Sequence, residues 1–165
     1  MRPAAWLLLA VTAQRLGELV VARRNTRRLL ERGAREVAPE HYPAIVALHA
    51  AWLGGLWLFA RNRPVDWPGL VAYLGLEAFR AWTLASIGSR WTTRILVVPG
   101  ETLVRRGPYR FLPHPNYLVV AAEIATLPLA LGRPRYALLF SLLNAAVLSV
   151  RIRAEERGLA EARRT

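Results

Sequence analysis

The stretch Pro43–Ala60, PAIVALHAAWLGGLWLFA, decides the fold class, because it contains neither an acidic residue nor an arginine. A helix that crosses the hydrocarbon core of a bilayer needs about 20 mostly apolar residues. Four further apolar segments run over Ala4–Ala22, Trp67–Ile87, Tyr117–Leu131 and Tyr136–Val150. Their apolar residues do not alternate with polar ones, which argues against strands. We predict an all-α integral membrane protein with about five transmembrane helices, of which the last two are short.

The composition supports a membrane protein over a soluble basic one. The 165 residues are 54% apolar and carry a formal net charge of +12. Every basic residue is arginine, and most of them lie between the apolar segments. A nucleic-acid-binding protein instead gathers its basic residues on a soluble surface, so we predict no nucleic-acid partner. The chain has no cysteine, which excludes disulfides, thiolate catalysis and cysteine-bound metal, and no metal site is predicted.

The arginines predict the orientation in the membrane, because cytoplasmic loops carry an excess of them. Six lie in Arg23–Glu40, five in Arg90–Arg110 and five after Val150. The opposite side carries five, namely Arg2, Arg61, Arg63, Arg133 and Arg135. We therefore predict a multi-pass protein with an external N-terminus, and with the long loop and the C-terminal tail in the cytoplasm. A cleaved signal peptide is an alternative for the first segment, although the arginines after Ala22 are typical of the cytoplasmic end of a span.

The loop before the fourth apolar segment contains two turn signals, Pro99-Gly100 and Gly107-Pro108. Residues with β-branched side chains lie on both sides of the first turn. This pattern predicts a short hairpin that pairs residues 94–98 with residues 102–105.

Ionisable residues interrupt the apolar segments. Arg15 and Glu18 lie three residues apart in the first segment, and Glu77 and Arg80 in the third, so each pair shares a helix face. Glu123 lies in the fourth segment, two turns after a His-Pro dipeptide. Charges inside a bilayer are costly and usually face the interior of the bundle. Interhelical ion pairs are one interpretation and a functional site is the other.

The strongest local signal is the run LVRRGPYRFLPHPNY over residues 103–117. Pro115 suits the first turn of a helix, where a missing N–H costs nothing, and this places His114 at the N-cap. The unpaired N–H groups of such a helix start favour a carboxylate or a phosphate. Tyr109 and Tyr117 offer aromatic faces that could hold adenine or a sulfonium.

A second signal follows the last apolar segment. Arg151 and Glu155 lie four residues apart and so share one helix face. A carboxylate at this place could accept both hydroxyl groups of a ribose. A solvated charged tail is the alternative.

The joint pattern of these two signals resembles the isoprenylcysteine carboxyl methyltransferase family. It comprises Leu-Val, a loop tyrosine, His-Pro-x-Tyr, two apolar segments and Arg-x-x-x-Glu, within Glu101–Leu159. The first three segments match in general character, and residues 15–35 are similar to a bacterial branch. The resemblance implies one membrane domain over residues 1–165. Residues 1–88 form its three-span part, and residues 89–165 supply a cofactor-binding loop, two spans and a cytoplasmic C-terminal helix that closes a cofactor pocket.

The resemblance also implies an S-adenosyl-L-methionine site. The residues that it places at the cofactor are Thr102, Leu103, Val104, Tyr109, His114, Pro115, Asn116, Tyr117 and Glu155. Arg151 is implied to contact the substrate. One departure concerns Pro113, which stands where the family usually has an arginine that precedes the histidine. If that arginine anchors the cofactor carboxylate, Arg106 or Arg110 must replace it.

The implied reaction is methylation of a carboxyl or hydroxyl oxygen on a lipophilic acceptor at the membrane, such as a small lipid or a prenylated cysteine. A carboxylate acceptor needs only positioning, for which Arg151 would serve. A hydroxyl acceptor needs a proton acceptor, and Glu123, Glu156 and His114 are candidates. A membrane reductase of sterol-reductase-like architecture and a non-catalytic membrane protein or transporter are the alternative functions.

Overall fold

Proline fixes the start of each long helix. The computed structural model describes residues 2–162, and each of its five long helices has a proline at its first or second residue. This is the position where a missing backbone N–H costs no hydrogen bond. The helices are α1 (Pro3–Glu31), α2 (Tyr42–Phe59), α3 (Trp67–Ile87), α4 (Pro115–Ala130) and α5 (Pro134–Ala162).

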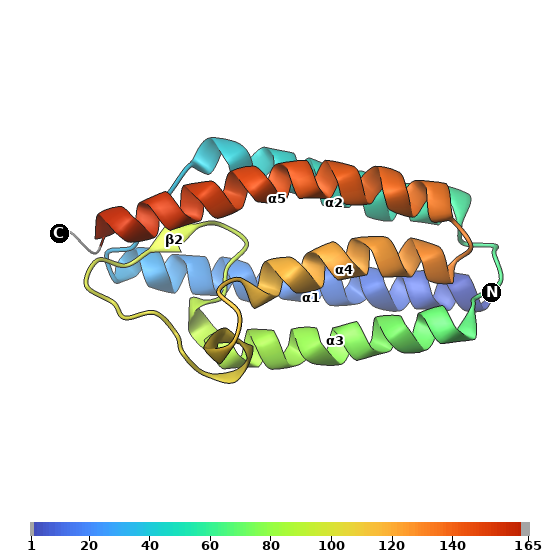
Figure 1. The fold of residues 1–165 in the computed structure, drawn as a ribbon, viewed down its shortest axis with the longest axis horizontal. Coiled ribbons are helices and arrows are strands. Elements are labelled where there is room, and N and C mark those ends of the chain that lie inside the picture. Colours follow the sequence, from blue (N-terminus) through green and yellow to red (C-terminus); the bar gives the residue numbers. More distant parts are fainter. Residues whose placement is uncertain (1, 163–165) are drawn as a thin grey trace.

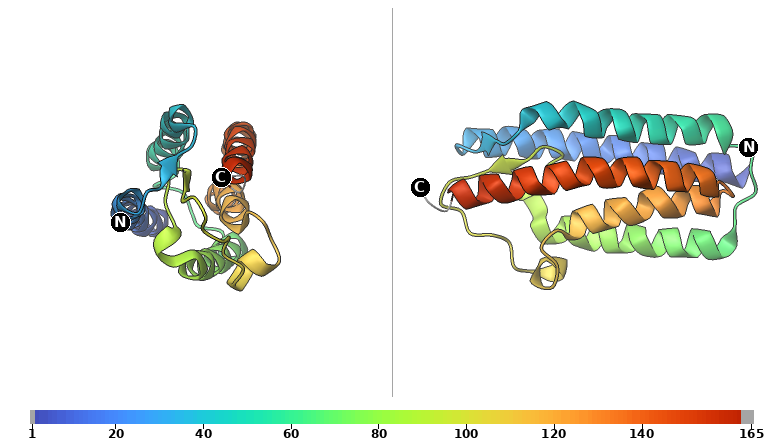
Figure 2. Two further views of the ribbon diagram at one scale, coloured as in Figure 1. Left: turned by 90° about the vertical axis from the view of Figure 1, so that its left-hand side faces the viewer. Right: turned by 45° about the horizontal axis from the view of Figure 1, so that its top comes forward.

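The five helices run along one long axis and form a bundle (Figure 1). Viewed from one end, α4 lies between α3 and α5, and α2 lies beside α5 (Figure 2). The fully buried side chains of Leu8, Trp52, Leu56, Leu127 and Leu131 form its apolar core. Leu8 comes from the first segment, so α1 is part of this core.

The outer surface of the bundle is also apolar. Leu58 is 74% exposed, Trp67 72%, Val71 66% and Leu142 64%, which a soluble surface would not tolerate in such number. Helices α1, α2, α3 and α5 are long and apolar enough to cross a membrane, whereas α4, with 16 residues, is shorter. The chain is therefore a multi-pass membrane protein that is almost entirely helical, as predicted.

Two helices extend well beyond the predicted spans. Helix α1 continues from Ala22 to Glu31, and α5 joins the last span and the C-terminal helix into one rod of 29 residues. The C-terminal helix is thus a direct continuation of the last span. Because no linker separates the last span from the C-terminal helix, the packing of the last span in the bundle fixes the direction of the C-terminal helix.

The predicted hairpin is wrong. Strand β2 (Leu96–Val97) pairs antiparallel with β1 (Arg35–Glu36), which follows α1, and not with residues 102–105. Contacts with α1 and β1 hold the loop in this place: Asn25 donates to the carbonyl of Trp91 over 2.8 Å, and Arg94 donates to both carboxylate oxygens of Glu36. The turn at Gly100 does form, with a positive φ of 73°, but a non-local partner pairs with the strand before it.

Three short 3₁₀ turns complete the connections. They are η1 (Pro39–His41), η2 (Gly88–Arg90) and η3 (Gly107–Arg110). The last of them leads from the long loop towards α4. A Cβ at Gly107, where φ is +56°, would lie 1.9 Å from the hydroxyl of Ser86, so only glycine allows this close approach to α3.

Candidate active site

The start of α4 lies against the far part of α5. His114 is the N-cap of α4 and Pro115 its first residue, as the sequence predicts. The Nδ1 atom of His114 lies 3.9 Å from Glu155 Oε2, and its Nε2 atom lies 3.5 Å from Glu156 Oε1. The structure therefore brings the His-Pro motif and the tail carboxylates together at one end of the bundle.

Two tyrosines flank this contact. The ring of Tyr117 lies 5.6 Å from the ring of His114, tilted by 31°, and Tyr117 is within reach of Glu155 and Arg151. Burial, together with the nearby carboxylate of Glu155, raises the pKa of Tyr109 to about 12. Tyr109 is therefore a neutral phenol at physiological pH. Glu155 is thus close to two tyrosines, one at each end of the segment 109–117.

Two acceptor atoms at this place have no partner. Among residues 2–162, neither Oε2 of Glu155 nor Oδ1 of Asn116 accepts a hydrogen bond, although both atoms are buried. Buried oxygen atoms are normally hydrogen-bonded, and a group left without a partner needs an explanation. A ligand that carries hydroxyl or amine donors would provide these hydrogen bonds.

Arg151 is almost fully buried, with 5% of its surface exposed. Its guanidinium donates to the carbonyl of Thr93 over 3.0 Å, which fixes α5 against the loop before β2. A guanidinium has five N–H donors, so this single bond leaves others for a ligand. Sequence analysis missed Thr93, because a backbone carbonyl leaves no signal in a residue pattern.

The segment Thr102–Val104 has no regular secondary structure. Thr102 and Leu103 are exposed and Val104 is half-buried. The carbonyl of Thr102 accepts a hydrogen bond from Arg90 over 2.6 Å. Within the described part of the chain, none of the three side chains hydrogen-bonds to His114 or Glu155. A role for them in cofactor binding stays a prediction.

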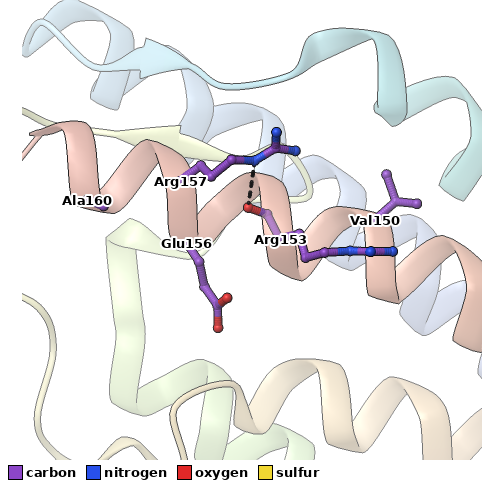
Figure 3. A pocket seen from close by; sticks show the side chains of 5 residues that line it. All are labelled: Val150, Arg153, Glu156, Arg157 and Ala160. Carbon is purple, nitrogen blue, oxygen red and sulfur yellow. Dashed lines mark hydrogen bonds between the residues drawn. The ribbon is translucent and has the colours of Figure 1, made fainter.

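Two open depressions are lined by residues that neighbour His114 or Glu155 in the sequence. One has a volume of about 600 Å³ and lies on α5, where Glu156 lines it (Figure 3). Its other lining residues are Val150, Arg153, Arg157 and Ala160. The second, of about 510 Å³, is lined by Arg105, Tyr109, Arg110, Phe111, Leu112 and Pro113. That the C-terminal helix closes a cofactor pocket stays a prediction.

The two arginines that could replace the one missing at Pro113 have different surroundings. Arg106 donates to the carbonyl of Ser86 over 2.6 Å and so holds the loop to the end of α3. Arg110 lines the second depression next to Tyr109, with its guanidinium 5.6 Å from the ring of Phe111. Arg110 is therefore the better placed of the two to meet a carboxylate there.

The sequence profile of the isoprenylcysteine carboxyl methyltransferase (ICMT) family matches residues 69–161, more than half of the chain. The chain belongs to this family. It is also similar to a protein of Bacillus subtilis (strain 168) named "Uncharacterized protein YpbQ", with 43% identity over 162 residues, 94% of this chain and 96% of that protein. Membership in the ICMT family indicates a membrane methyltransferase, which agrees with the bundle of apolar helices.

The ICMT match begins at the start of α3 and includes both parts of the cluster around His114. It leaves out α1, β1 and α2. Val37, which directly follows β1 and lies outside the matched range, packs closely against the C-terminal part of α5. A Cβ at Gly158 on α5 would lie 2.6 Å from a methyl group of Val37. Gly158 is an isolated glycine in a charged helical segment, and a glycine at such a position indicates close packing against another part of the chain.

Exchange of Gly158 for valine should push α5 away from Val37 and move Glu155, one turn earlier. Overpacking of this kind costs about 1–3 kcal/mol. We expect weaker binding of any ligand held by Glu155, and partial recovery in the double variant Gly158→Val/Val37→Ala, which removes the clashing methyl groups of Val37. Gly54→Val is the matched control, because no atom lies within 4 Å of a Cβ built there. Equal ligand affinity in the Gly158 and Gly54 variants would show that this packing does not position the tail.

Glu123 lies away from the His114 cluster, in a buried ion network. Its Oε2 atom lies 2.7 Å from Arg15 and 3.2 Å from Arg80. Arg80 also contacts Glu18 over 2.7 Å, and Arg15 contacts Glu77 over 3.5 Å. The network joins α1, α3 and α4, and each arginine bridges carboxylates from different helices. The charged residues inside the apolar segments therefore form ion pairs between helices, which is the first of the two interpretations given above.

The network contains one more carboxylate than guanidinium. Gln14 compensates in part, since its amide donates to Glu77 over 2.5 Å and to Glu18 over 3.1 Å. Sequence analysis missed Gln14, because a single amide in an apolar helix has no distinctive spacing. Glu123 contacts Arg15 and Arg80 inside the bundle, so its carboxylate belongs to this network and not to the cluster around His114.

Proposed function

We propose that this protein is an S-adenosyl-L-methionine-dependent methyltransferase that methylates a carboxyl or hydroxyl oxygen of a lipophilic acceptor at the membrane. The observation that carries the proposal is the unpaired, buried oxygen of Glu155, close to Tyr109 and Tyr117 and beside the N-cap of α4. A nucleoside offers two ribose hydroxyls to such an oxygen. Family membership supports the reaction type.

Each residue of the cluster has a chemical task in this proposal. Glu155 accepts hydrogen bonds from the ribose, and the aromatic faces of Tyr109 and Tyr117 contact adenine or the sulfonium. The free backbone N–H groups of Asn116 and Tyr117, at the start of α4, attract the amino-acid carboxylate, with Arg110 nearby. When bound, the cofactor supplies an electrophilic methyl group on a positively charged sulfur. Catalysis then depends mainly on alignment of the acceptor oxygen with that methyl group.

The acceptor decides which residues handle a proton. A carboxylate acceptor is already ionised, and Arg151 would orient it through the donors that Thr93 leaves free. A hydroxyl acceptor must lose a proton, which His114 could receive while Glu156, 3.5 Å from its Nε2, stabilises the imidazolium. Glu123 is less suited to this step, because it lies in the ion network with Arg15 and Arg80 and not beside His114.

The decisive experiment is calorimetric binding of S-adenosylhomocysteine to the purified protein in detergent. We expect saturable binding with one site per chain. No binding of this ligand, combined with binding of a phosphorylated nicotinamide, would favour the membrane reductase. The absence of both would favour a non-catalytic protein or a transporter.

The type of acceptor oxygen follows from a second measurement. Lipid extracts from cells that lack the protein are incubated with purified protein and methyl-labelled cofactor, with a prenylated cysteine as a parallel acceptor. A methyl ester releases labelled methanol in mild alkali, whereas a methyl ether keeps its label. Release of label identifies a carboxyl acceptor, and retention identifies a hydroxyl acceptor.

The proposed orientation places the cluster in the cytoplasm, where the long loop and the tail carry most of the arginines. Because the chain has no cysteine, single cysteines report sidedness directly. We expect an impermeant maleimide to label Asn62→Cys in intact cells, and to label Thr102→Cys only after permeabilisation. The reverse pattern would place the site outside.

A further inference from the structure

The last turns of α1 are fixed to the loop before β2. Ala22, Asn25 and Leu29 are buried and repeat at helical spacing, so they form one face of the extension. The side chain of Asn25 donates to the carbonyl of Trp91, which is itself 5% exposed. This part of α1 is therefore a packed rod, and it ends at the same end of the bundle as β2 and the C-terminal part of α5 (Figure 1).

The other faces of this rod carry arginines without partners. Arg23, Arg24, Arg27 and Arg28 are all exposed, and within residues 2–162 none of them makes an ion pair. Three other arginines at this end do have carboxylate partners: Arg94 contacts Glu36 over 2.7 Å, and Arg32 and Arg90 contact Glu101. Four guanidiniums on two successive turns thus form a surface of uncompensated positive charge, which we name the α1 arginine surface.

The α1 arginine surface directly follows the apolar part of α1. Val20 and Val21, directly before it, are each 48% exposed and apolar, so they face the lipid chains. A rise of 1.5 Å per residue places Arg23–Arg28 about 3–12 Å farther along the axis. The headgroup region on each side of the hydrocarbon core is about 5–8 Å thick. With the hydrocarbon core ending at Val21, Arg23 and Arg24 lie at the level of the phosphate groups, and Arg27 and Arg28 lie just beyond it, within reach of a long side chain.

From this placement we infer that the α1 arginine surface binds the phosphate groups of anionic phospholipids in the cytoplasmic leaflet. Arg23 and Arg27 are neighbours one turn apart, as are Arg24 and Arg28, so each pair can hold one phosphate between two guanidiniums. Clusters of four or more basic residues next to a membrane helix attract anionic lipid through this chemistry. The surface lies outside the range matched by the family, and its occupation does not depend on the methyl transfer reaction.

The test compares two charge-neutralised variants of the full-length protein in detergent micelles. Arg23→Gln/Arg27→Gln removes one pair from the α1 arginine surface, and Arg61→Gln/Arg135→Gln removes two exposed arginines at the opposite end of the bundle. Binding of phosphatidylglycerol and of phosphatidylcholine is measured by native mass spectrometry. Each arginine near an anionic surface contributes roughly a fivefold factor, so we expect the first variant to bind phosphatidylglycerol about 25-fold more weakly. The second variant should bind it like the unmodified protein.

Four outcomes would overturn the inference, of which three concern lipid binding. These are equal binding of both lipids by the unmodified protein, equal loss in the two variants, and undiminished binding at a salt concentration that screens exposed charges. Preferential binding of a short RNA over phosphatidylglycerol would also overturn it and identify a different partner. Thermal unfolding of both variants confirms that they are folded before lipid is added.

Discussion

Replacement of Glu155 by alanine should reduce the affinity for S-adenosylhomocysteine at least about 100-fold. Hydrogen bonds to a charged group contribute about 1.5–3 kcal/mol each, and a ribose offers two of them. The buried Oε2 atom of Glu155 accepts no hydrogen bond among residues 2–162, and His114 Nδ1 lies 3.9 Å from it, beyond hydrogen-bond distance, so a ligand can form these bonds. Isothermal titration in detergent measures the change, and methyl transfer should fall with it.

The matched control for this variant is Glu161→Ala, an exposed carboxylate on the same helix, which should bind S-adenosylhomocysteine normally. Glu155→Gln keeps the size of the side chain and should lose less affinity than Glu155→Ala. If the unmodified protein binds the ligand and Glu155→Ala binds it equally well, then the nucleoside lies elsewhere and the cluster around His114 is not the cofactor site.

Replacement of Arg80 by methionine should destabilise the bundle by about 3–5 kcal/mol, because it leaves buried carboxylates without a counter-charge. Arg80 is 6% exposed and contacts both Glu18 and Glu123. The network already has more carboxylates than guanidiniums, so this loss increases an existing imbalance. In thermal unfolding in detergent we expect the midpoint to fall by roughly 10 °C.

Two further variants test whether the loss of stability in Arg80→Met comes from the buried carboxylates that lose their counter-charge, or from the removal of any arginine side chain. Arg90→Met removes a half-exposed ion pair with Glu101 and should cost less than about 1 kcal/mol. Arg80→Met/Glu18→Leu removes a charge of each sign and should recover part of the stability lost in Arg80→Met. Equal midpoints for Arg80→Met and Arg90→Met would mean that the network does not stabilise the bundle.

The network and the His114 cluster have different tasks in this protein. The network lies within the helices and holds α1, α3 and α4 in one register, while the cluster lies at one end, where a soluble cofactor could arrive. Glu123, two turns into α4, belongs to the first and not to the second. Its proximity to the His-Pro motif along the sequence was therefore a weak guide to function.

The family resemblance identified the residues of the cluster around His114, but not the groups that hold them in place. His114, Tyr117 and Glu155 come together as the motif spacing implied. The groups that position them lie elsewhere: the carbonyl of Thr93 and the side chain of Val37 both belong to loops. No residue pattern near the motif predicts either contact, because both depend on how distant segments pack.

The sequence by itself determined where the helices lie, that they belong in a membrane, and that His114 caps α4. These features depend on local physics: the length of an apolar run and the missing N–H of a proline in the first turn. Only the tertiary structure decided that β2 pairs with β1, that Arg15 meets Glu123 across 108 residues, and that Arg151 anchors the tail. These contacts depend on how the helices pack. A buried charged side chain contacts the opposite charge that the packed bundle brings within a few ångströms, and that residue can lie anywhere in the sequence.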